Sequence, residues 1–447
     1  MSERVRVVFH ELERRSGTTS EVARASGVSE AEVGLQLKML NDRLRVEFGF
    51  DSDPIDVSAT GGWRMDGIAG LLRLNERVEL EVVPKFLDPE SETWRMDFFV
   101  LAVLVQTGHL LTHDEITADE ADRGALATLI ARSLLSMHEE NQRRPIRGYR
   151  RHAHADFSLD GDVEWESLAL PEPDGFRMGK LELTRRNPFN ATLIAALETL
   201  IPEVSDADTQ AQLEMRARGL QPQVRPPALY PTLPPRFSGW ETAYELSQLV
   251  IGGLGLDLTA GRFTGPGFVL STWQAWQQLC EEVVRRANPG RRVRSQAAFT
   301  LGLRDQKPVL VWPDIAVERG AAGTLLLDAK YKTRLGKTPR IASADLYESL
   351  AFVCAAKTGY IGLLYPSSRP VEDLPTGSWR RFDRVNVDWA TVDGFEVQVQ
   401  GLGSRGGFDR LVGAARASQL AHTEGGVVPS SASEPLPLHV GSSKYGP

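Results

Sequence analysis

Apolar runs in the last third of the chain end in acidic residues. Residues 309–312 are followed by a proline and Asp314, and residues 325–327 are followed by Asp328, an alanine and Lys330. Runs of this length are typical of buried strands. Because side chains on a strand alternate between its two faces, Asp328 and Lys330 point the same way. We therefore expect two adjacent strand ends to present two carboxylates and one ammonium group to a common point.

Two helices and a third strand are predicted around this segment. Residues 272–284 carry apolar side chains at positions 273, 276, 280, 283 and 284, which is a helical period. Glu281 and Glu282 both lie off the apolar face, and the period does not separate them. Residues 345–352 predict a second helix, and residues 360–365 predict a buried strand closed by a proline. The expected order is helix, strand, strand, helix, strand.

The two carboxylates and the lysine indicate metal-dependent chemistry. Two carboxylates suit a hard, oxygen-seeking cation such as Mg²⁺, and a nearby lysine can orient or deprotonate an attacking water. That is the chemistry of phosphodiester hydrolysis. Asp314, Asp328 and Lys330 resemble the PD-(D/E)xK nuclease motif, in which a third acid often lies on the preceding helix. The bare motif is also found as solvated charges at a strand end, but the order of the surrounding elements favours a nuclease.

The remaining patterns divide the chain into four regions. We expect a mixed α/β domain over residues 1–160, a helical and linker region over 161–260, a nuclease domain over 261–416 and a disordered tail over 417–447, which is rich in Ser, Pro and Gly. The expected fold class is a multidomain α+β or α/β protein, with a mixed sheet flanked by helices in the nuclease core.

Residues 23–33 have the alanine, glycine and valine spacing of a helix-turn-helix. Its second helix begins with Ser-Glu-Ala-Glu, which is acidic and poorly suited to a groove lined with phosphates. A packed helical hairpin or a partner-binding wing is therefore favoured over a DNA-reading unit.

Landmarks along most of the chain resemble the McrC family, the nuclease subunit of modified-cytosine restriction systems. They are a hairpin over residues 67–86 that ends in Pro84-Lys85, an arginine-rich stretch at 143–149, Asn-Pro-Phe-Asn at 187–190, and Leu-Cys-Glu at 279–281. The similarity covers about residues 60–370. The family has Leu-Phe-Glu at the last landmark, which favours Glu281 over Glu282 as the third acid.

The resemblance implies a site and a reaction. It implies an Mg²⁺-dependent endonuclease that cleaves double-stranded DNA in defence against phage. Asp314, Asp328 and Glu281 would bind the metal, with the Ala329 carbonyl completing part of its shell, and Lys330 would position the attacking hydroxide.

The resemblance also implies a partner. The N-terminal region would dock on an McrB-like AAA+ GTPase ring and stimulate its hydrolysis, and that partner would recognise the modified cytosine. Arg143, Arg144 and Arg147 are the candidate docking residues, because arginine suits phosphate and acidic surfaces. The chain has no G-x-x-x-x-G-K-[ST] loop, so we expect the nucleotide to be hydrolysed by the partner.

Two positions depart from the family pattern. The helix after the lysine usually carries Q-x-x-x-Y, and here these positions are Glu348 and Phe352. Glutamate cannot donate as an amide does, and phenylalanine lacks the hydroxyl. Two alternative hypotheses therefore stay open: an NTPase-activating adaptor with a weakened nuclease site, and a stand-alone repair or resolvase nuclease without a motor.

Composition and charge narrow the class of protein. The chain has 447 residues, 42% of them hydrophobic and 25% charged, and two cysteines. It shows no apolar leader and no run near the ~18 residues needed to span a bilayer, so we expect a cytoplasmic protein with no membrane contact.

The net charge of −8 argues against a protein that binds DNA with its whole surface. Arginines and lysines nevertheless cluster on both sides of the acidic motif, where phosphate contacts would be required. The candidate phosphate-binding residues are Lys332, Arg334, Arg291 and Arg292.

Overall fold

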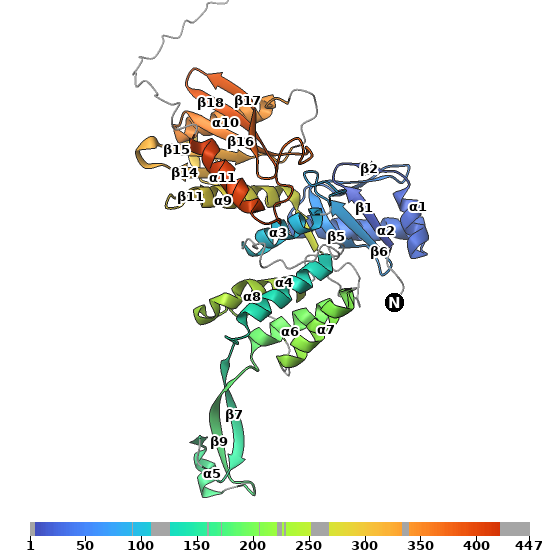
Figure 1. Cartoon of the computed structure of the whole chain (residues 1–447), viewed down its shortest axis with the longest axis vertical. Coiled ribbons are helices and arrows are strands. Elements are labelled where there is room, and N and C mark those ends of the chain that lie inside the picture. The colour runs from blue at the N-terminus through green and yellow to red at the C-terminus, as the bar shows by residue number, and fades with distance from the viewer. Residues whose placement is uncertain are drawn as a thin grey trace, which may run out of the picture.

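The chain forms three lobes and a projecting arm in the computed structural model (Figure 1). The structure describes residues 5–91, 93–108, 126–158, 161–170, 172–204, 206–220, 226–227, 229–251, 268–332 and 339–420. None of the helices in these ranges is both long and apolar enough to cross a membrane. The chain is a mixed α/β protein with several separate sheets, as expected.

The N-terminal lobe is built on a four-stranded sheet in the order β1-β6-β5-β10, beside a three-stranded sheet in the order β2-β4-β3. The expected hairpin over residues 67–86 is confirmed as the antiparallel pair β5–β6. The fourth strand, β10, comes from much later in the sequence and leads directly into helix α9. The elements are β1 (Val5–His10), β2 (Arg14–Arg15), α1 (Thr18–Ser26), α2 (Glu30–Phe48), β3 (Ile55–Val57), β4 (Trp63–Met65), β5 (Ile68–Arg73), β6 (Val78–Val83) and β10 (Phe268–Ser271).

Helices α1 and α2 form a packed hairpin over this lobe. Gly27 ends α1 in the left-handed conformation, which glycine adopts at little cost. Ser29 caps α2, its side chain accepting the Glu32 N–H. Val22 and Val33 are fully buried in the core that the helices share with the sheet. The expectation of a packed helical hairpin over residues 23–33 is therefore confirmed.

A helical lobe follows the N-terminal lobe. Its apolar faces belong to one large core that continues into the C-terminal lobe. Asn187 caps α6, its side chain accepting the Asn190 N–H at 3.0 Å, and Pro188 occupies the first turn. The Asn-Pro-Phe-Asn landmark is thus a helix start. The elements are α3 (Trp94–Thr107), α4 (Leu126–Asn141), α6 (Pro188–Leu200), η3 (Ile201–Glu203), α7 (Ala207–Gly219), η4 (Pro235–Trp240) and α8 (Glu241–Ile251).

The arm projects from the helical lobe (Figure 1). It consists of β7 (Gly148–Asp156), β8 (Asp162–Val163), α5 (Trp165–Ala169) and β9 (Phe176–Thr184). Strands β7 and β9 pair antiparallel over nine residues each. The boundary expected at residue 160 therefore falls inside one hairpin, and the helix that precedes the arm packs with helices that follow it.

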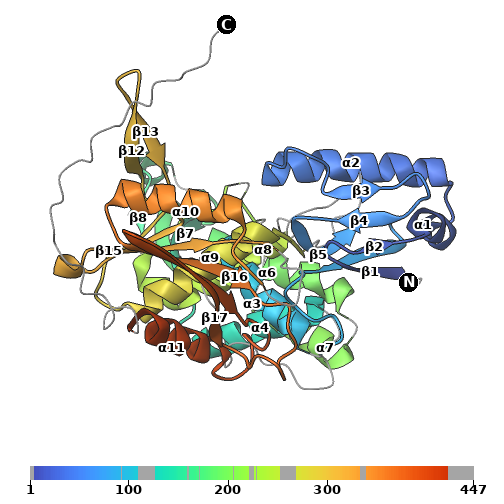
Figure 2. The same ribbon diagram turned by 90° about the horizontal axis from the view of Figure 1, so that it is seen from above.

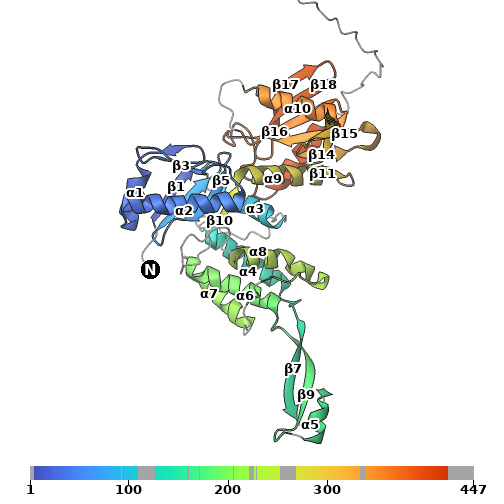
Figure 3. The same cartoon turned by 180° about the vertical axis from the view of Figure 1, so that it is seen from behind.

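The C-terminal lobe contains a six-stranded mixed sheet in the order β11-β14-β15-β16-β18-β17. Helix α10 lies on one side of it and α11 on the other (Figure 2). Helix α9 runs from the N-terminal lobe into this lobe (Figure 3). The elements are α9 (Thr272–Ala287), β11 (Val293–Ser295), β12 (Phe299–Arg304), β13 (Lys307–Val311), β14 (Ile315–Glu318), η5 (Gly320–Ala322), β15 (Thr324–Ala329), α10 (Ser343–Ala356), β16 (Tyr360–Pro366), β17 (Trp379–Val387), β18 (Ala390–Val397) and α11 (Gly407–Leu420).

Burial of both sheet faces explains the continuous apolar run in β15. Leu325 and Leu327 pack in the core that contains α9 and α11, and Leu326 packs in the core that contains α10. A strand covered on both faces has no solvent side, so its sequence does not alternate. The expected first helix, second strand, second helix and third strand are α9, β15, α10 and β16, whereas the strand that precedes β15 in the main sheet is β14 and not residues 309–312.

Two expectations for this lobe were wrong. Residues 309–312 do not form the core strand that ends at Asp314; β13 pairs with β12 in a separate hairpin, and Trp312 is 53% exposed. Pro313 has no N–H for a strand ladder, and Asp314 precedes the new strand β14. Residues 417–420, which were expected to belong to the tail, are the last residues of α11; residues 421–447 lie outside the described part of the chain.

Candidate active site

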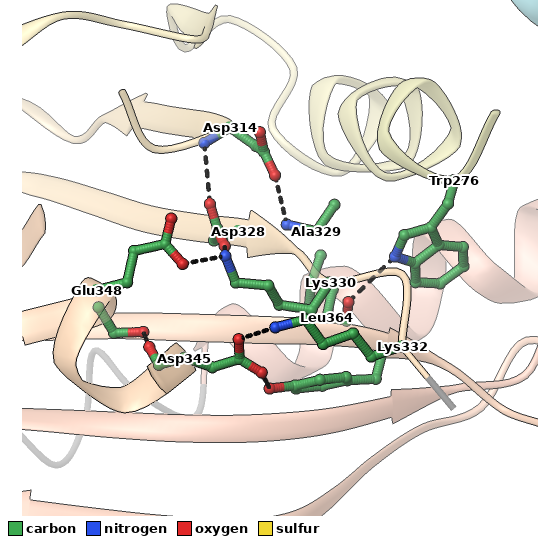
Figure 4. Close-up of polar contacts among 11 residues, drawn as sticks. Trp276, Asp314, Asp328, Ala329, Lys330, Lys332, Asp345, Glu348 and Leu364 are labelled. Atoms are coloured by element: carbon green, nitrogen blue, oxygen red, sulfur yellow. Dashed lines mark hydrogen bonds and ion pairs between the residues drawn. The ribbon is translucent and has the colours of Figure 1, made fainter. Parts of the chain in front are cut away.

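Strand register brings Asp314 and Asp328 together. Strands β14 and β15 are antiparallel, with Ile315 opposite Leu327, so the next pair along the ladder is Asp314 and Asp328. The Asp314 N–H donates to Asp328 Oδ1 at 3.4 Å, and the Ala329 N–H donates to Asp314 Oδ2 at 2.8 Å. The two carboxylates therefore meet at one edge of the sheet, although Asp314 starts a strand rather than ending one (Figure 4).

This carboxylate pair is electrostatically strained. Asp328 is 2% exposed and Asp314 is half-buried. Burial, and then the neighbouring charge of Asp328, raise the pKa of Asp314 to about 7, against the stabilising Ala329 N–H and the Lys330 ammonium. Near neutral pH the pair therefore favours a bound proton or a cation over two free negative charges.

Lys330, which directly follows β15, faces the same point. Its Nζ lies 2.6 Å from Asp328 Oδ2 and 2.8 Å from Glu348 Oε2. Burial works to lower the pKa of Lys330, but the charges of Asp328 and Glu348 outweigh it and raise the pKa. Lys330 is therefore held as a cation, which suits it to orient a water rather than to deprotonate one.

Helix α10 supplies two acids to the lysines of this segment. Glu348 contacts Lys330, and Asp345, one turn earlier, pairs with Lys332 Nζ and accepts the Tyr365 hydroxyl at 2.9 Å. Asp345 is 1% exposed. Asp345 was not among the site residues predicted from the sequence. It lies three positions before Glu348 on α10, so the two acids face the same side of the helix, where they contact Lys332 and Lys330.

The departure at Glu348 and Phe352 has a structural account. Glu348 accepts from the lysine through its carboxylate, so this contact does not need an amide donor. Phe352 is buried in the core between α10 and the sheet, where a hydroxyl would need its own partner.

Glu281 and Glu282 are separated by the contacts of α9. Glu281 accepts from the Gln277 amide at 3.0 Å and the Ser295 hydroxyl at 2.6 Å, and its charge helps to raise the pKa of Asp314. Glu282 instead pairs with the exposed Arg285 and Arg286. Of the two glutamates, Glu281 therefore faces the carboxylate pair.

The side chains that could hold a metal ion are those of His, Cys, Asp and Glu. Across the described ranges, no three of them converge closely enough to hold an ion. Asp314 and Asp328 meet, whereas Glu281 is held by its own two donors. Asp328 Oδ2 lies 2.6 Å from the Lys330 ammonium.

The carbonyl of Leu364 on β16 joins the motif to α9. It accepts the Lys330 N–H at 2.8 Å and the Trp276 indole N–H at 3.1 Å. Strand β16 therefore holds the N–H of Lys330, and α9 holds the same carbonyl of β16 (Figure 4).

The candidate phosphate-binding residues are spread out. Lys332 lies two residues after Lys330, and its ammonium pairs with Asp345. Arg292 lies beside Glu318, whose N–H bonds to the Arg292 carbonyl, so Arg291 and Arg292 sit at the far end of β14 from Asp314. Four residues of strand separate these ends, about 13 Å. Arg334 lies outside the described residues.

The candidate docking arginines lie at the root of the arm. Arg143, Arg144 and Arg147 are exposed and fall between α4 and β7. The Trp240 indole donates to the Arg144 carbonyl at 2.8 Å, which fixes this turn to the helical lobe.

Comparisons with known proteins give one family and two solved structures. A family model described as "McrBC 5-methylcytosine restriction system component" matches residues 63–366. A chain in a refined half-complex from a tetradecameric assembly of Thermococcus gammatolerans McrB AAA+ hexamers with bound McrC is 15% identical, with a TM-score of 0.68 over 93% of this chain and 100% of that chain. A chain in the Thermococcus gammatolerans McrBC complex, solved by cryo-electron microscopy, is 14% identical, with a TM-score of 0.48 over 64% and 90%. No curated protein matches the sequence.

Proposed function

This chain belongs to the McrBC 5-methylcytosine restriction system component family, that of McrC, and from that premise we propose that it is the Mg²⁺-dependent DNA endonuclease subunit of such a system. It acts with an McrB-like AAA+ GTPase ring, whose hydrolysis it stimulates and which selects the modified DNA. The observation that carries the nuclease assignment is the meeting of Asp314, Asp328 and Lys330 at one sheet edge.

The donor set at this edge fits Mg²⁺. Asp314 and Asp328 offer hard carboxylate oxygens, and because burial and the charge of Asp328 raise the pKa of Asp314, a bound cation would stabilise the pair. These two residues, with the Ala329 carbonyl, would hold the ion, and Glu281 would reach it directly or through water. When bound, Mg²⁺ supplies the positive charge that stabilises the transition state of phosphodiester hydrolysis.

Lys330 supplies the fixed positive charge beside the carboxylates. Because Asp328 and Glu348 keep it protonated, its ammonium donates to the attacking water and orients it toward phosphorus. Glu348 is a second acid partner of the ammonium, at 2.8 Å. This contact favours an organised nuclease site over an adaptor with a weakened one.

We assign docking on the ring to the arm and its root. Trp165 and Leu170 near the arm's end are 85% and 82% exposed, and Tyr149 and Leu181 on its strands are also exposed. An extended hairpin of this kind buries little apolar surface by itself, so these side chains are available to a partner. The exposed Arg143, Arg144 and Arg147 add positive charge at the root. This surface favours a motor-coupled nuclease over a stand-alone one.

The test uses the purified chain with an McrB-like AAA+ GTPase and DNA containing modified cytosine. We expect cleavage that requires Mg²⁺, the partner and GTP, and no cleavage by the Asp328→Asn variant. Cleavage by that variant at the wild-type rate would remove the site assignment. Full cleavage without the partner would favour a stand-alone nuclease.

A further inference from the structure

The Pro84-Lys85 landmark lies against the segment that follows the catalytic motif. Lys85 Nζ lies 3.4 Å from the centroid of the Tyr331 ring and donates to the Tyr331 carbonyl at 3.3 Å. Tyr331 is the residue directly after Lys330. A residue of the N-terminal lobe thus contacts both the side chain and the backbone of the motif's neighbour, 246 positions away.

A buried carboxylate completes this contact. Glu11, which follows β1, is 1% exposed. Its Oε1 accepts the Gly67 N–H at 3.0 Å and the Thr272 hydroxyl at 2.9 Å. Its Oε2 accepts the Lys85 N–H at 3.2 Å and the Tyr331 hydroxyl. One side chain therefore joins the N-terminal sheet to the start of α9 and to the motif segment.

Aromatic packing fills the space between these groups. The Phe86 ring lies 5.8 Å from the Tyr331 ring in an edge-to-face arrangement and 6.1 Å from the Trp276 ring. Trp276 in turn donates to the Leu364 carbonyl that also accepts the Lys330 N–H. The backbone is therefore held on both sides of Lys330: the Leu364 carbonyl accepts the Lys330 N–H, and Lys85 donates to the carbonyl of Tyr331, the next residue.

The charges at this junction depend on its closure. Burial raises the pKa of Glu11, against the opposing effects of Tyr331 and Lys85, and burial lowers the pKa of Lys85, against the charges of Glu11 and Asp66. Each group works against this effect of burial on the other: the Lys85 charge works to lower the pKa of Glu11, and the Glu11 charge works to raise the pKa of Lys85. Separation of the two lobes would hydrate both groups and release the Tyr331 hydroxyl.

We propose that Glu11 and Lys85 are positioning residues for the nuclease site, holding Tyr331 and thereby Lys330 and the start of α9 in place. The proposal rests on the nuclease function proposed above. It assigns to the N-terminal lobe a direct part in assembling the site, so that cleavage depends on how this lobe is seated.

The test compares two junction variants with matched controls. Lys85→Met removes the cation over an aromatic ring, and Arg95→Met is its control, because Arg95 lies over the Trp94 ring in the N-terminal half, with no contact to Tyr331 among the described residues. Tyr331→Phe removes a hydroxyl donated to a buried carboxylate, and Tyr360→Phe is its control, because Tyr360 donates to Asp393.

The first readout is hydrogen exchange at the amides of residues 329 and 330, measured without DNA or partner. We expect exchange to accelerate by about fivefold or more in both junction variants, the size expected for one lost hydrogen bond, and to stay unchanged in both controls. Equal exchange in junction and control variants would overturn the proposal, whether or not the protein cleaves DNA.

The second readout is cleavage with Mg²⁺ and the partner. We expect kcat to fall by about fivefold or more in the junction variants, with Tm lowered no further than in the controls, and Lys85→Arg to recover most of the rate. Loss of rate that follows Tm equally in all four variants would show a structural role only. Absence of cleavage by the wild-type chain would count against the nuclease function and leave the exchange result to decide the positioning role.

Discussion

The arm and the C-terminal sheet are both built from paired strands, but their apolar side chains differ in exposure to solvent. Leu325, Leu326 and Leu327 of β15 are at most 3% exposed, whereas Leu181 on the arm is 64% exposed. The sheet is covered by helices on both faces (Figure 2), and the arm projects from the helical lobe (Figure 1). Side chains that the fold leaves uncovered are available for a partner, and those that it covers define a rigid site.

Charged groups in the two regions differ for the same reason. In the sheet, burial next to Asp328 raises the pKa of Asp314 to about 7. On the arm, the Arg151–Asp162 pair at 3.4 Å is largely exposed on both sides, and water screens it. The sheet is therefore suited to chemistry that needs perturbed charges, and the arm is suited to recognition of a partner.

The largest effect is expected at the carboxylate pair. Asp328→Asn should lower Mg²⁺-dependent cleavage by at least about 10³-fold, because a bound metal contributes several kcal/mol to the transition state. It should also abolish any rise in Tm on adding Mg²⁺, since that rise reports binding to the folded state. The control is Asp393→Asn, a buried aspartate of the same sheet that pairs with Arg384. A retained Mg²⁺ response in Asp328→Asn would place the ion elsewhere.

A smaller loss is expected at the lysine. Lys330→Ala removes the ammonium that orients water but keeps both carboxylates, so cleavage should fall by about 10²-fold while Mg²⁺ still raises Tm. Lys38→Ala, which removes an exposed lysine of α2 in the N-terminal lobe, should keep kcat within a few-fold of wild type. Equal kcat values for the two variants would show that Lys330 has no special role.

The arm should affect partner binding without affecting the metal. Trp165→Ser together with Leu170→Ser removes two exposed apolar side chains, and the Kd for the AAA+ ring should rise about tenfold or more, given the burial energy of such groups. Binding can be measured by titration with labelled ring protein. Trp389→Ser in the C-terminal lobe, where Trp389 is 54% exposed, serves as the control. Equal affinities for the two variants would move the docking surface away from the arm.

The smallest effect is expected at Glu348. Glu348→Gln restores the family residue and weakens the ion pair with Lys330, in which the Glu348 side chain is half exposed. Such a pair contributes modestly, so cleavage should change by no more than about fivefold. A loss of cleavage as large as that of Lys330→Ala would indicate that Glu348 takes a direct part in the reaction.

The sequence predicted the core of the site because short-range rules govern it. Alternation on β15 places Asp328 and Lys330 on one side, and the structure brings them within 2.6 Å. The role of residues 309–312 was missed, because an apolar run does not reveal whether its strand joins the main sheet or a separate hairpin. Pro313 was the available signal for the break.

Contacts between distant segments were beyond the sequence patterns. Glu11 and Tyr331 are 320 positions apart, and nothing in either local pattern links them. The choice between Glu281 and Glu282 also needed the fold, because Arg285 and Arg286 on the next turn engage only one of them. The arm escaped notice because its exposed apolar residues do not follow the alternation that a half-buried strand shows.

The central claim is that chemistry in the sheet and docking through the arm are separate. It is tested most directly by the rate of GTP hydrolysis by the AAA+ partner in the presence of Asp328→Asn. We predict stimulation equal to that by the wild-type chain, although this variant does not cleave DNA. Loss of stimulation in a folded Asp328→Asn protein would contradict the claim, because docking would then require an intact metal site.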